Sequence, residues 1–596
     1  MNGNRNNMFL AIALSAMVIF AWQYFVVTPQ MKTDQARQAQ LAKEAKKQPQ
    51  AAQPGAAPGA APGNVPGMPG GVTVHMSREA ALKQGGARIM IDSPLLDGSI
   101  ALKGGKLDDL RLKKYHETLD PKSAEIVLLA PKGTDYPYYA QFGWIGKNVP
   151  TDQTVWTLAS GDTLSPGHPV TLTWDNGQGL IFTRVIAVDE QYMFSVTDSV
   201  NNTSGQAETL YPFAYVAREG VPKEQTSWVL HQGFVGVAEG SEVDAKYDDF
   251  KEDGTPPKTF SSTGGWVGIT DKYWMAAVIP PQGETYNGAY LGSKLGNDKA
   301  YQANYRLGAR IVAGGAQVAV KHQLFAGAKV VDILRGYQKS QNIARFDKAV
   351  DWGRFWFLTQ PLFWLLDIFN KFIGNFGIAI LMLTVVVKIL FFPLANASFK
   401  SMSRMKKVQP YMEEIKKAHK DDPQRQQQEM MALYRREKVN PLTGCLPMLI
   451  QIPVFFSLYK VLFVTIEMRQ APFYGWIHDL SAPDPTSILN LFGLLPYHIP
   501  AFIPAYLSIG IWPILMGVTQ FVQTKLNPAP ADPVQAKMFT FMPLIFTFMF
   551  ATFPAGLVIY YTWNNLLSVA QQYYIMRKEG VEVHLFKNLK FAKKKA

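Results

Sequence analysis

Hydrophobic and polar residues divide the chain into three regions of different pattern. The first holds an uncharged apolar run from Met8 to Val27. As a helix rising about 1.5 Å per residue, this run matches a bilayer core of roughly 30 Å. No small-x-small cleavage site follows Val27, so we interpret residues 1–28 as an uncleaved membrane anchor, with a cleaved signal peptide as the alternative. Residues 29–73 are rich in Pro, Gly and Ala, which predicts a flexible linker.

The second region, residues 74–345, alternates apolar and polar positions in short runs separated by turn residues. The runs from Val170 to Trp174 and from Leu180 to Val188 flank DNGQG, which predicts a β-hairpin with an Asn-Gly corner. ARIMI, YMFSVTDSV and QVAVKHQLF repeat this alternation. The region is therefore predicted to be a soluble β domain with a β-sandwich fold.

The third region carries longer apolar runs. Residues 355–372 space their polar positions by seven and four along a row of Phe, Trp and Leu, which predicts an amphipathic helix in the membrane surface. Further runs long enough to span a bilayer lie at about 376–394, 446–466, 506–525, 537–553 and 556–575. Together with the anchor, they predict an α-helical polytopic membrane protein with six transmembrane helices and a β-sandwich domain.

The distribution of charge predicts the orientation. The formal net charge is +13, and the basic residues gather at 398–440 and in the tail at 577–596. Both segments should be cytoplasmic, since Lys and Arg are retained on that side. One span, at 376–397, separates the basic loop from the β domain, and residues 441–576 hold four more. The β domain is then periplasmic and both termini are cytoplasmic.

The basic loop reads as two short helices separated by DDP, forming a cytoplasmic hairpin. Its lysines and those of the tail are either a solvated surface or a contact for anionic headgroups and ribosomal RNA. The candidate residues for that contact are Lys406, Lys407, Lys416, Lys417, Lys593, Lys594 and Lys595.

Two polar residues interrupt the apolar runs. Lys388 lies in TVVVKILFFPL, about five residues before Pro393, where its amine either faces a wet cavity or reaches the headgroups. Gln451 must face protein or water, because a glutamine in lipid needs a partner. Gln520, Gln523, Asn564 and Asn565 are interpreted as hydrogen-bonding groups between helices.

The segment from Val439 to Lys460, VNPLTGCLPMLIQIPVFFSLYK, resembles the signature of the YidC/Oxa/Alb membrane-protein insertases. DPVQAKMFTFMPLIFTFMF and FPAGLVIYYTWNNLLSVAQQYY extend the resemblance over residues 350–578. The large β domain after one anchor is similar to the Gram-negative branch of that family. The resemblance implies a supersandwich-like periplasmic domain and a core of five conserved helices.

The resemblance also implies a hydrophilic groove that is open to the cytoplasm and to lipid, where one basic residue receives the polar part of an incoming protein. That position matches Lys388, whereas the best-known bacterial members have an arginine. The lysine keeps the charge but loses the forked donor geometry. Thr384, Gln451 and Tyr561 match groove-facing positions of the family.

The partners implied are nascent membrane proteins, the ribosome, the SecYEG and SecDF translocon components and membrane lipids. The implied location is the bacterial inner membrane. No cofactor, metal, catalytic residue or small-molecule substrate is expected, and the chain has neither GxxxxGK[ST] nor HExxH.

Two other functions are weighed against this one. A secondary transporter would use Lys388 as its ion or substrate site, but it should show internal repeats, and the five spans show no pairing. An anchored periplasmic carbohydrate enzyme would need paired carboxylates or a histidine in a pocket.

Residues 488–507 add apolar residues and prolines beyond the pattern that is common in the insertase family. We hypothesise that this segment lies in the outer leaflet.

Overall fold

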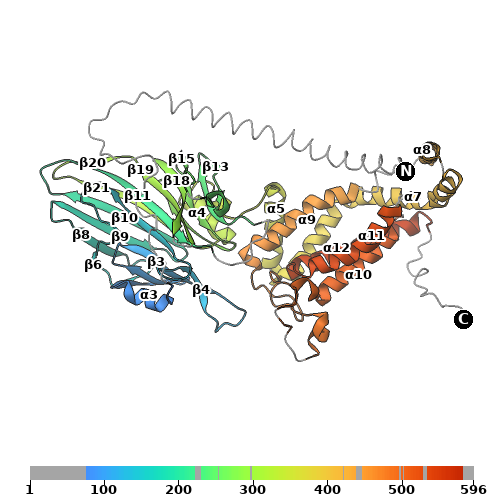
Figure 1. Cartoon of the computed structure of the whole chain (residues 1–596), viewed down its shortest axis with the longest axis horizontal. Coiled ribbons are helices and arrows are strands. Elements are labelled where there is room, and N and C mark those ends of the chain that lie inside the picture. Colours follow the sequence, from blue (N-terminus) through green and yellow to red (C-terminus); the bar gives the residue numbers. More distant parts are fainter. Residues whose placement is uncertain are drawn as a thin grey trace, which may run out of the picture.

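The computed structural model describes residues 75–221, 230–252, 254–295, 298–420, 422–437, 446–495, 499–500, 502–527 and 533–581. The predicted anchor, the linker and the lysines of the tail lie outside these residues. Figure 1 shows a β domain and a helical bundle that follow each other along the long axis of the molecule.

Within the described residues, the strands of the β domain form two sheets. The first sheet has the spatial order β15 (Lys258–Thr263), β18 (Thr285–Leu295), β19 (Asp298–Leu307), β11 (Glu208–Glu219), β5 (Tyr138–Ile145), β3 (Lys106–His116), β2 (Leu96–Ala101), β1 (Arg88–Asp92) and β7 (Thr163–Leu164), with β20 (Arg310–Val312) paired to β11 and β4 (Glu125–Leu129) to β3. The second has the order β13 (Ser241–Glu242), β12 (Gly233–Ala238), β16 (Trp266–Thr270), β17 (Trp274–Ile279), β21 (Gln317–Ala328), β10 (Met193–Asn202), β9 (Leu180–Val188), β8 (Val170–Asp175) and β6 (Thr157–Ser160), with β14 (Ala245–Lys246) paired to β12. The strand pairs are antiparallel apart from β1 with β7.

Period-two alternation explains the core between these sheets. Along β9, every second side chain is buried, from Leu180 through Phe182 to Ile186. The predicted hairpin is confirmed, because β8 and β9 pair antiparallel and Gly177 in the turn has φ +67°. The same alternation places Arg184 in the core, where it faces Asp198 of β10.

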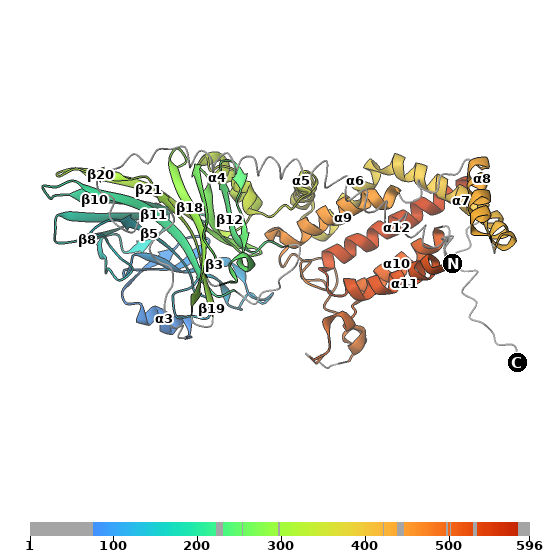
Figure 2. The same ribbon diagram turned by 45° about the horizontal axis from the view of Figure 1, so that its top comes forward.

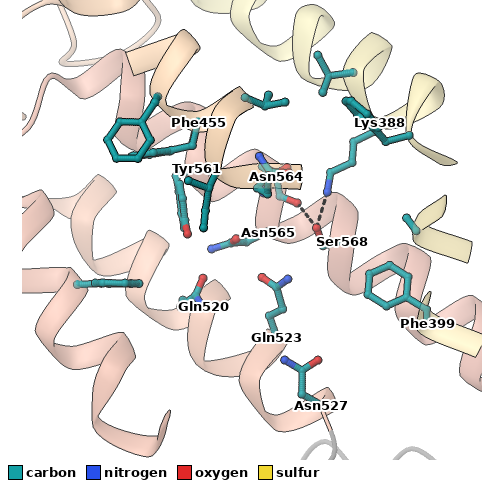
Figure 3. A pocket seen from close by; sticks show the side chains of 18 of the residues that line it. Lys388, Phe399, Phe455, Gln520, Gln523, Asn527, Tyr561, Asn564, Asn565 and Ser568 are labelled. Carbon is teal, nitrogen blue, oxygen red and sulfur yellow. Dashed lines mark hydrogen bonds between the residues drawn. The ribbon is translucent and has the colours of Figure 1, made fainter. Parts of the chain in front are cut away.

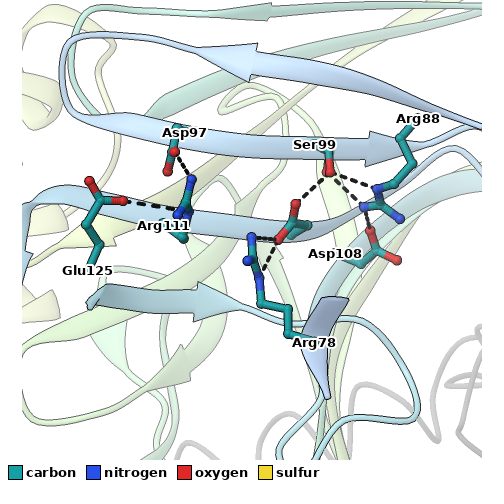
Figure 4. Close-up of polar contacts among 8 residues, drawn as sticks. Arg78, Arg88, Asp97, Ser99, Asp108, Arg111 and Glu125 are labelled. Carbon is teal, nitrogen blue, oxygen red and sulfur yellow. Dashed lines mark hydrogen bonds and ion pairs between the residues drawn. The ribbon is translucent and has the colours of Figure 1, made fainter. Parts of the chain in front are cut away.

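Partly buried ion pairs join strands near one edge of the first sheet to one another and to helix α3, Arg78–Gln84 (Figure 4). Arg78, on α3, pairs with Asp109 of β3. Ser99 donates to Asp109 at 2.6 Å and accepts from Arg88 at 2.7 Å, and Arg88 also pairs with Asp108. Because each of these groups has a charged or hydroxyl partner, the network fixes α3 on the sheet.

The bundle follows the short helices α4 (Val331–Ser340) and η3 (Phe346–Ala349) at the end of the β domain. Its helices are α5 (Trp356–Ile373), α6 (Phe376–Leu390), α7 (Phe392–Ala418), α8 (Pro423–Arg436), α9 (Leu446–Val464), η5 (Ile466–Met468), η6 (Ile488–Gly493), η7 (Ala505–Leu507), α10 (Ile511–Leu526), α11 (Pro533–Phe550) and α12 (Ala555–Lys578). Figure 2 shows α12 running through the bundle, where it packs against α6, α7, α9 and α10.

Among the described residues, no single helix combines the length and the apolar character needed to cross a bilayer. One bent pair, α6 followed by α7, meets these two criteria when the helices are taken together. Shorter apolar stretches lie in α9 and α11, at Gln451–Val464 and Lys537–Phe550.

The bend between α6 and α7 differs from the sequence prediction, which continued the span to residue 397 and began the hairpin at 398. α6 ends at Leu390, and α7 begins at Phe392 at an angle of 69°. Pro393 explains the break, because a proline has no N–H and is tolerated only in the first turn of a helix. The hairpin therefore consists of a long α7 and a shorter α8.

The β domain and the bundle are joined by polar contacts. Glu467, beyond the end of α9, accepts from the backbone N–H of Val331 at 3.0 Å. Gln470 donates to the carbonyl of Thr118 at 2.9 Å, in the connection between β3 and β4. Lys460 of α9 pairs with Asp351 at 2.5 Å, just before α5. These contacts fix one end of the bundle against the β domain.

Candidate functional site

A cavity of about 350 Å³ lies inside the bundle, among α6, α7, α9, α10, α11 and α12 (Figure 3). Its apolar lining includes aromatic side chains of α9 and α11, among them Phe455 and Phe550, and Phe399 and Met402 of α7. Most of its polar lining comes from α10 and α12, and we call these side chains the polar wall. A polypeptide segment with both polar and apolar side chains would find matching groups for each.

The polar wall follows from helical spacing. Gln520, Gln523 and Asn527 recur at three and four residues, so they share one face of α10. On α12, the same spacing brings Tyr561, Asn564, Asn565 and Ser568 to the cavity. Carboxamides both donate and accept, so this wall can hydrogen-bond a peptide without carrying charge.

Lys388 enters the cavity from α6 and is half-buried there. Of the described residues that line the cavity, it alone is charged. Its Nζ donates to Ser568 Oγ at 2.6 Å, and the Ser568 hydroxyl donates in turn to the Asn564 carbonyl at 2.7 Å. Lys388 therefore acts as a donor to the serine, and this arrangement is that of a held cation rather than of a nucleophile with its base.

Comparison with known proteins places this cavity in context. The family model described as the YidC periplasmic domain matches residues 88–365, and the model described as the 60Kd inner membrane protein matches residues 368–581. The membrane protein insertase YidC of Methylobacterium radiotolerans is 52% identical over 99% of this chain and 97% of its own. That of Rhizobium meliloti is 51% identical over 99% of each chain.

The chain belongs to the YidC family of membrane protein insertases. A solved structure described as an active YidC insertase with its first transmembrane domain resolved covers 85% of this chain and 95% of its own, at 19% identity and a TM-score of 0.35. The two family models and the two curated relatives confirm, at the level of the family, the resemblance drawn from the sequence. Because the relatives that match over the whole chain are named membrane protein insertases, we set aside the transporter and carbohydrate-enzyme alternatives.

Three of the groove residues expected from the YidC family line one cavity. These are Lys388, Gln451 and Tyr561. Gln451 donates to the Tyr560 hydroxyl at 2.8 Å, and the Tyr561 ring packs edge-on against Phe455. The fourth expected residue, Thr384, is not among the lining residues. It is 1% exposed, and its hydroxyl donates to the carbonyl of Ile380 at 2.7 Å.

The amides that the sequence assigned to contacts between helices also line the cavity. Asn565 does donate across helices, to Thr519 Oγ1 at 3.3 Å. Gln520, in contrast, has a buried Oε1 without a hydrogen-bond partner among the described residues. Asn527 and Ser568 were missed by the sequence analysis. Their signal was the continued spacing of polar positions along α10 and α12.

The candidate lysines of the hairpin lie on α7. Lys407 and Lys417 are exposed, while Lys406 and Lys416 are partly buried. Lys407 donates to the Glu579 carbonyl at the end of α12, and Lys400 pairs with the Glu579 carboxylate at 3.1 Å. Part of the basic surface of α7 is therefore used to hold the end of α12. The tail lysines lie outside the described residues.

Proposed function

We propose that this chain inserts transmembrane segments of nascent membrane proteins into the bacterial inner membrane through the cavity around Lys388. The observation that carries the proposal is a cation with donors to spare in a cavity that both carboxamide and aromatic side chains line. Family membership supports the same function. No chemical bond of the client needs to change, so the chain acts as an insertase and folding chaperone rather than as an enzyme.

Charge explains how the cavity lowers the barrier. Carrying one charged side chain to the bilayer centre costs about 2.5–3.5 kcal/mol, so a client tail with two acidic residues costs roughly 5–7 kcal/mol. Lys388 offers such a tail a point charge part-way across, and the amides of α10 and α12 replace some of its hydrogen bonds to water. The client's apolar helix then passes along the aromatic side chains of the cavity into lipid, where its burial drives the reaction.

The membrane potential assists the acidic groups. It contributes about 2.3 kcal/mol per charge for each 100 mV as they move outward. This direction requires the β domain to be periplasmic and both termini to be cytoplasmic. The proposed organisation is an anchor at 1–28, a linker at 29–73, the β domain at 74–345, the surface helix near 355–372, the cytoplasmic hairpin and the basic tail.

The proposed partners on the cytoplasmic side are the ribosome and anionic lipid headgroups, with SecYEG and SecDF as partners within the membrane. The exposed Lys417 supports an electrostatic contact, whereas Lys407 already bonds to the Glu579 carbonyl. Replacing Lys417 by Gln should weaken ribosome co-sedimentation, most of all at low salt, since screening removes the same contact. The matched control is Lys321→Gln, an exposed lysine of the β domain. Equal binding by both variants would dismiss this role of α7.

Site-specific crosslinking tests the insertion pathway. A photoreactive side chain at Gln523 or Lys388 should crosslink a stalled nascent membrane protein, because both positions line the cavity. Ile389 is the matched control, since it follows Lys388 on α6 but is 67% exposed and does not line the cavity. Crosslinks of equal strength from Ile389 and Gln523 would show that the client slides over the outside of the bundle, and the proposed pathway would fail.

A further inference from the structure

The described residues between Ile488 and Leu507 form an apolar projection at the end of the bundle near the β domain (Figure 2). We call it the outer loop. Figure 2 shows it standing off from the bundle beside the ends of α10 and α11. From Pro485 to Thr524 the chain contains no Asp, Glu, Lys or Arg. None of the described residues of η6 and η7 within the outer loop is buried.

Large apolar side chains of the outer loop face outward. Leu494 is 83% exposed and Phe502 is 85% exposed. Leu491 and Phe492, at the turn, both have positive φ, at 49° and 60°. Residues without glycine's freedom rarely adopt this conformation twice in succession, and here it keeps both side chains on the surface. A loop surrounded by water gains nothing from such an arrangement, because it leaves apolar area in water.

The base of the outer loop, in contrast, is polar and fixed. Asp484 accepts from the indole N–H of Trp476 at 3.1 Å and from the backbone N–H of Trp512 at 2.9 Å. Thr486 accepts from the N–H of Ile511 at 3.0 Å, so two side chains cap the first turn of α10. Ile488 donates to the carbonyl of Ile509 at 2.8 Å and closes the loop. The exposed tip is therefore held in place by a structured base.

The exposed surface of the outer loop continues along the helices. η7 packs against α11, whose outward residues Leu544 and Ile545 are 55% and 59% exposed. Near the base, Tyr474 and Tyr506 are 63% and 52% exposed. Tyrosines gather at membrane interfaces, where the ring meets lipid and the hydroxyl meets water. The loop thus extends an apolar helix surface at the level of an aromatic belt.

We propose that the outer loop is a lipid-binding foot that inserts into the outer leaflet of the bilayer beside α10 and α11. The occupant of its surface is lipid acyl chain, because a long stretch without charge and its continuity with the apolar helix face offer nothing for an aqueous ligand. The foot fixes the depth of that end of the bundle. This inference requires the bundle to lie in a membrane, but it does not depend on the insertase function.

Fluorescent labelling with depth-dependent quenchers tests the foot. In a Cys445→Ser background, which leaves no other cysteine, Phe502→Cys is labelled with an environment-sensitive dye in the full chain. The protein is reconstituted in liposomes of phosphatidylethanolamine and phosphatidylglycerol. Spin-labelled lipids with a shallow nitroxide should quench this label at least about twofold more than aqueous iodide does. The same result is expected for Leu494→Cys.

Two matched positions calibrate the result. Ile311→Cys, on β20 of the β domain, replaces a side chain that is 75% exposed, and iodide alone should quench its label. Ile545→Cys, on α11, should respond to deeper nitroxides. If the labels at Phe502 and Leu494 behave like the one at Ile311, the foot is in water and the proposal is overturned. Protection from both lipid and aqueous quenchers would place a protein partner there and would also overturn it.

Loop replacement provides an independent measurement. Exchanging residues 489–506 for a short Gly-Ser linker should leave insertion of a reconstituted client within about twofold, because the cavity around Lys388 is lined by other residues. Complete loss of insertion would show that the loop contacts the client, and the assignment to lipid would be abandoned.

Discussion

The β domain and the helical bundle each hold a cation away from bulk water, and the two cations differ in their hydrogen-bond partners. Arg184 in the β domain is 1% exposed and pairs with Asp198 through two bonds of 2.6 and 2.8 Å. Its remaining donors reach the carbonyls of Gly105 and Phe142. Lys388 in the bundle has one hydroxyl partner, Ser568, and no carboxylate within salt-bridge distance among the described residues.

This difference separates a structural charge from an available one. A buried charge that is paired and fully hydrogen-bonded fixes the fold, and it has no capacity left for a ligand. A cation that is held by one neutral group in a cavity keeps most of its hydrogen-bond donors available for a ligand. By this criterion, Lys388 rather than Arg184 is suited to the client contact proposed above.

The largest effect is expected from breaking the structural pair. Arg184→Met leaves the Asp198 carboxylate buried and unpaired, which should destabilise the β domain by about 3–5 kcal/mol. The measurement is hydrogen exchange of the β9 and β10 amides in the full chain in nanodiscs. The double variant Arg184→Met with Asp198→Leu is the control, because removing both charges should recover most of the loss.

If hydrogen exchange is unchanged in Arg184→Met, the Arg184–Asp198 pair does not stabilise the β domain as predicted. Exchange that stays fast in the double variant would instead assign the loss to packing, since Arg184 also lies over the Trp156 ring at 5.0 Å.

A second test uses a charged group at the junction of the two regions. Burial raises the pKa of the Glu467 carboxyl to about 7, the nearby Asp367 and Asp332 act in the same direction, and the Val331 N–H opposes them. Because the folded pKa is above the unfolded value of 4.5, the stabilising contribution is complete below the unfolded pKa and is lost as pH rises through the folded one. Glu467→Gln should remove this dependence.

The thermal stability of the full chain in detergent, compared at about pH 5.5 and about pH 8, measures this effect. Relative to the natural protein, the free energy of unfolding of the variant should be higher at the higher pH, by about 3 kcal/mol at most. Asp479→Asn is a control, because among the described residues Asp479 accepts hydrogen bonds within its own segment, from Gln470 and Ser481. If the difference in stability between Glu467→Gln and the natural protein is the same at both pH values, the pKa of Glu467 is not raised and the prediction is wrong.

Much of the fold was accessible from periodicity, because alternation and helical spacing are local properties. They predicted the β8–β9 hairpin. The groove position of Lys388, in contrast, was implied by the resemblance to the insertase family. Periodicity also did not show where the second span bends. Pro393 is compatible both with the start of a new helix and with a kink within one span, and the packing around it decides which of the two forms. The contact of Gln470 with Thr118 also lay beyond reach, since it joins residues far apart in the chain.

The site was predicted only in part, for a similar reason. The resemblance to the insertase family placed Thr384 in the groove, yet Thr384 turns its hydroxyl to its own helix, an option that any threonine in a helix has. Ser568 carried no signal by itself, because a serine among apolar residues can bond to its own backbone. The partner of Lys388 is fixed by the packing of α6 against α12, which the sequence does not encode locally.

The third test alters the available charge itself. Lys388→Arg should stay active, Lys388→Ala should slow insertion of clients with acidic translocated tails about tenfold, and Lys388→Glu should be worse because it repels them. Clients with neutral tails should change by less than about twofold, and the stability of the bundle should stay the same, unlike the result for Arg184. Protease protection of clients in proteoliposomes measures insertion. Equal activity of all three variants would mean that the amine merely reaches the headgroups.

The smallest effect is expected at Ser568, which positions Lys388 without touching the client. Ser568→Ala should slow insertion of acidic clients about two- to threefold, because the amine loses the group that holds it. The matched control is Ser403→Ala, since Ser403 on α7 is equally buried and bonds to its own helix at 2.8 Å. In a Lys388→Ala background, Ser568→Ala should have no further effect. An additive loss there would mean that Ser568 acts on the client directly, and the polar wall rather than the lysine would then be the main contact.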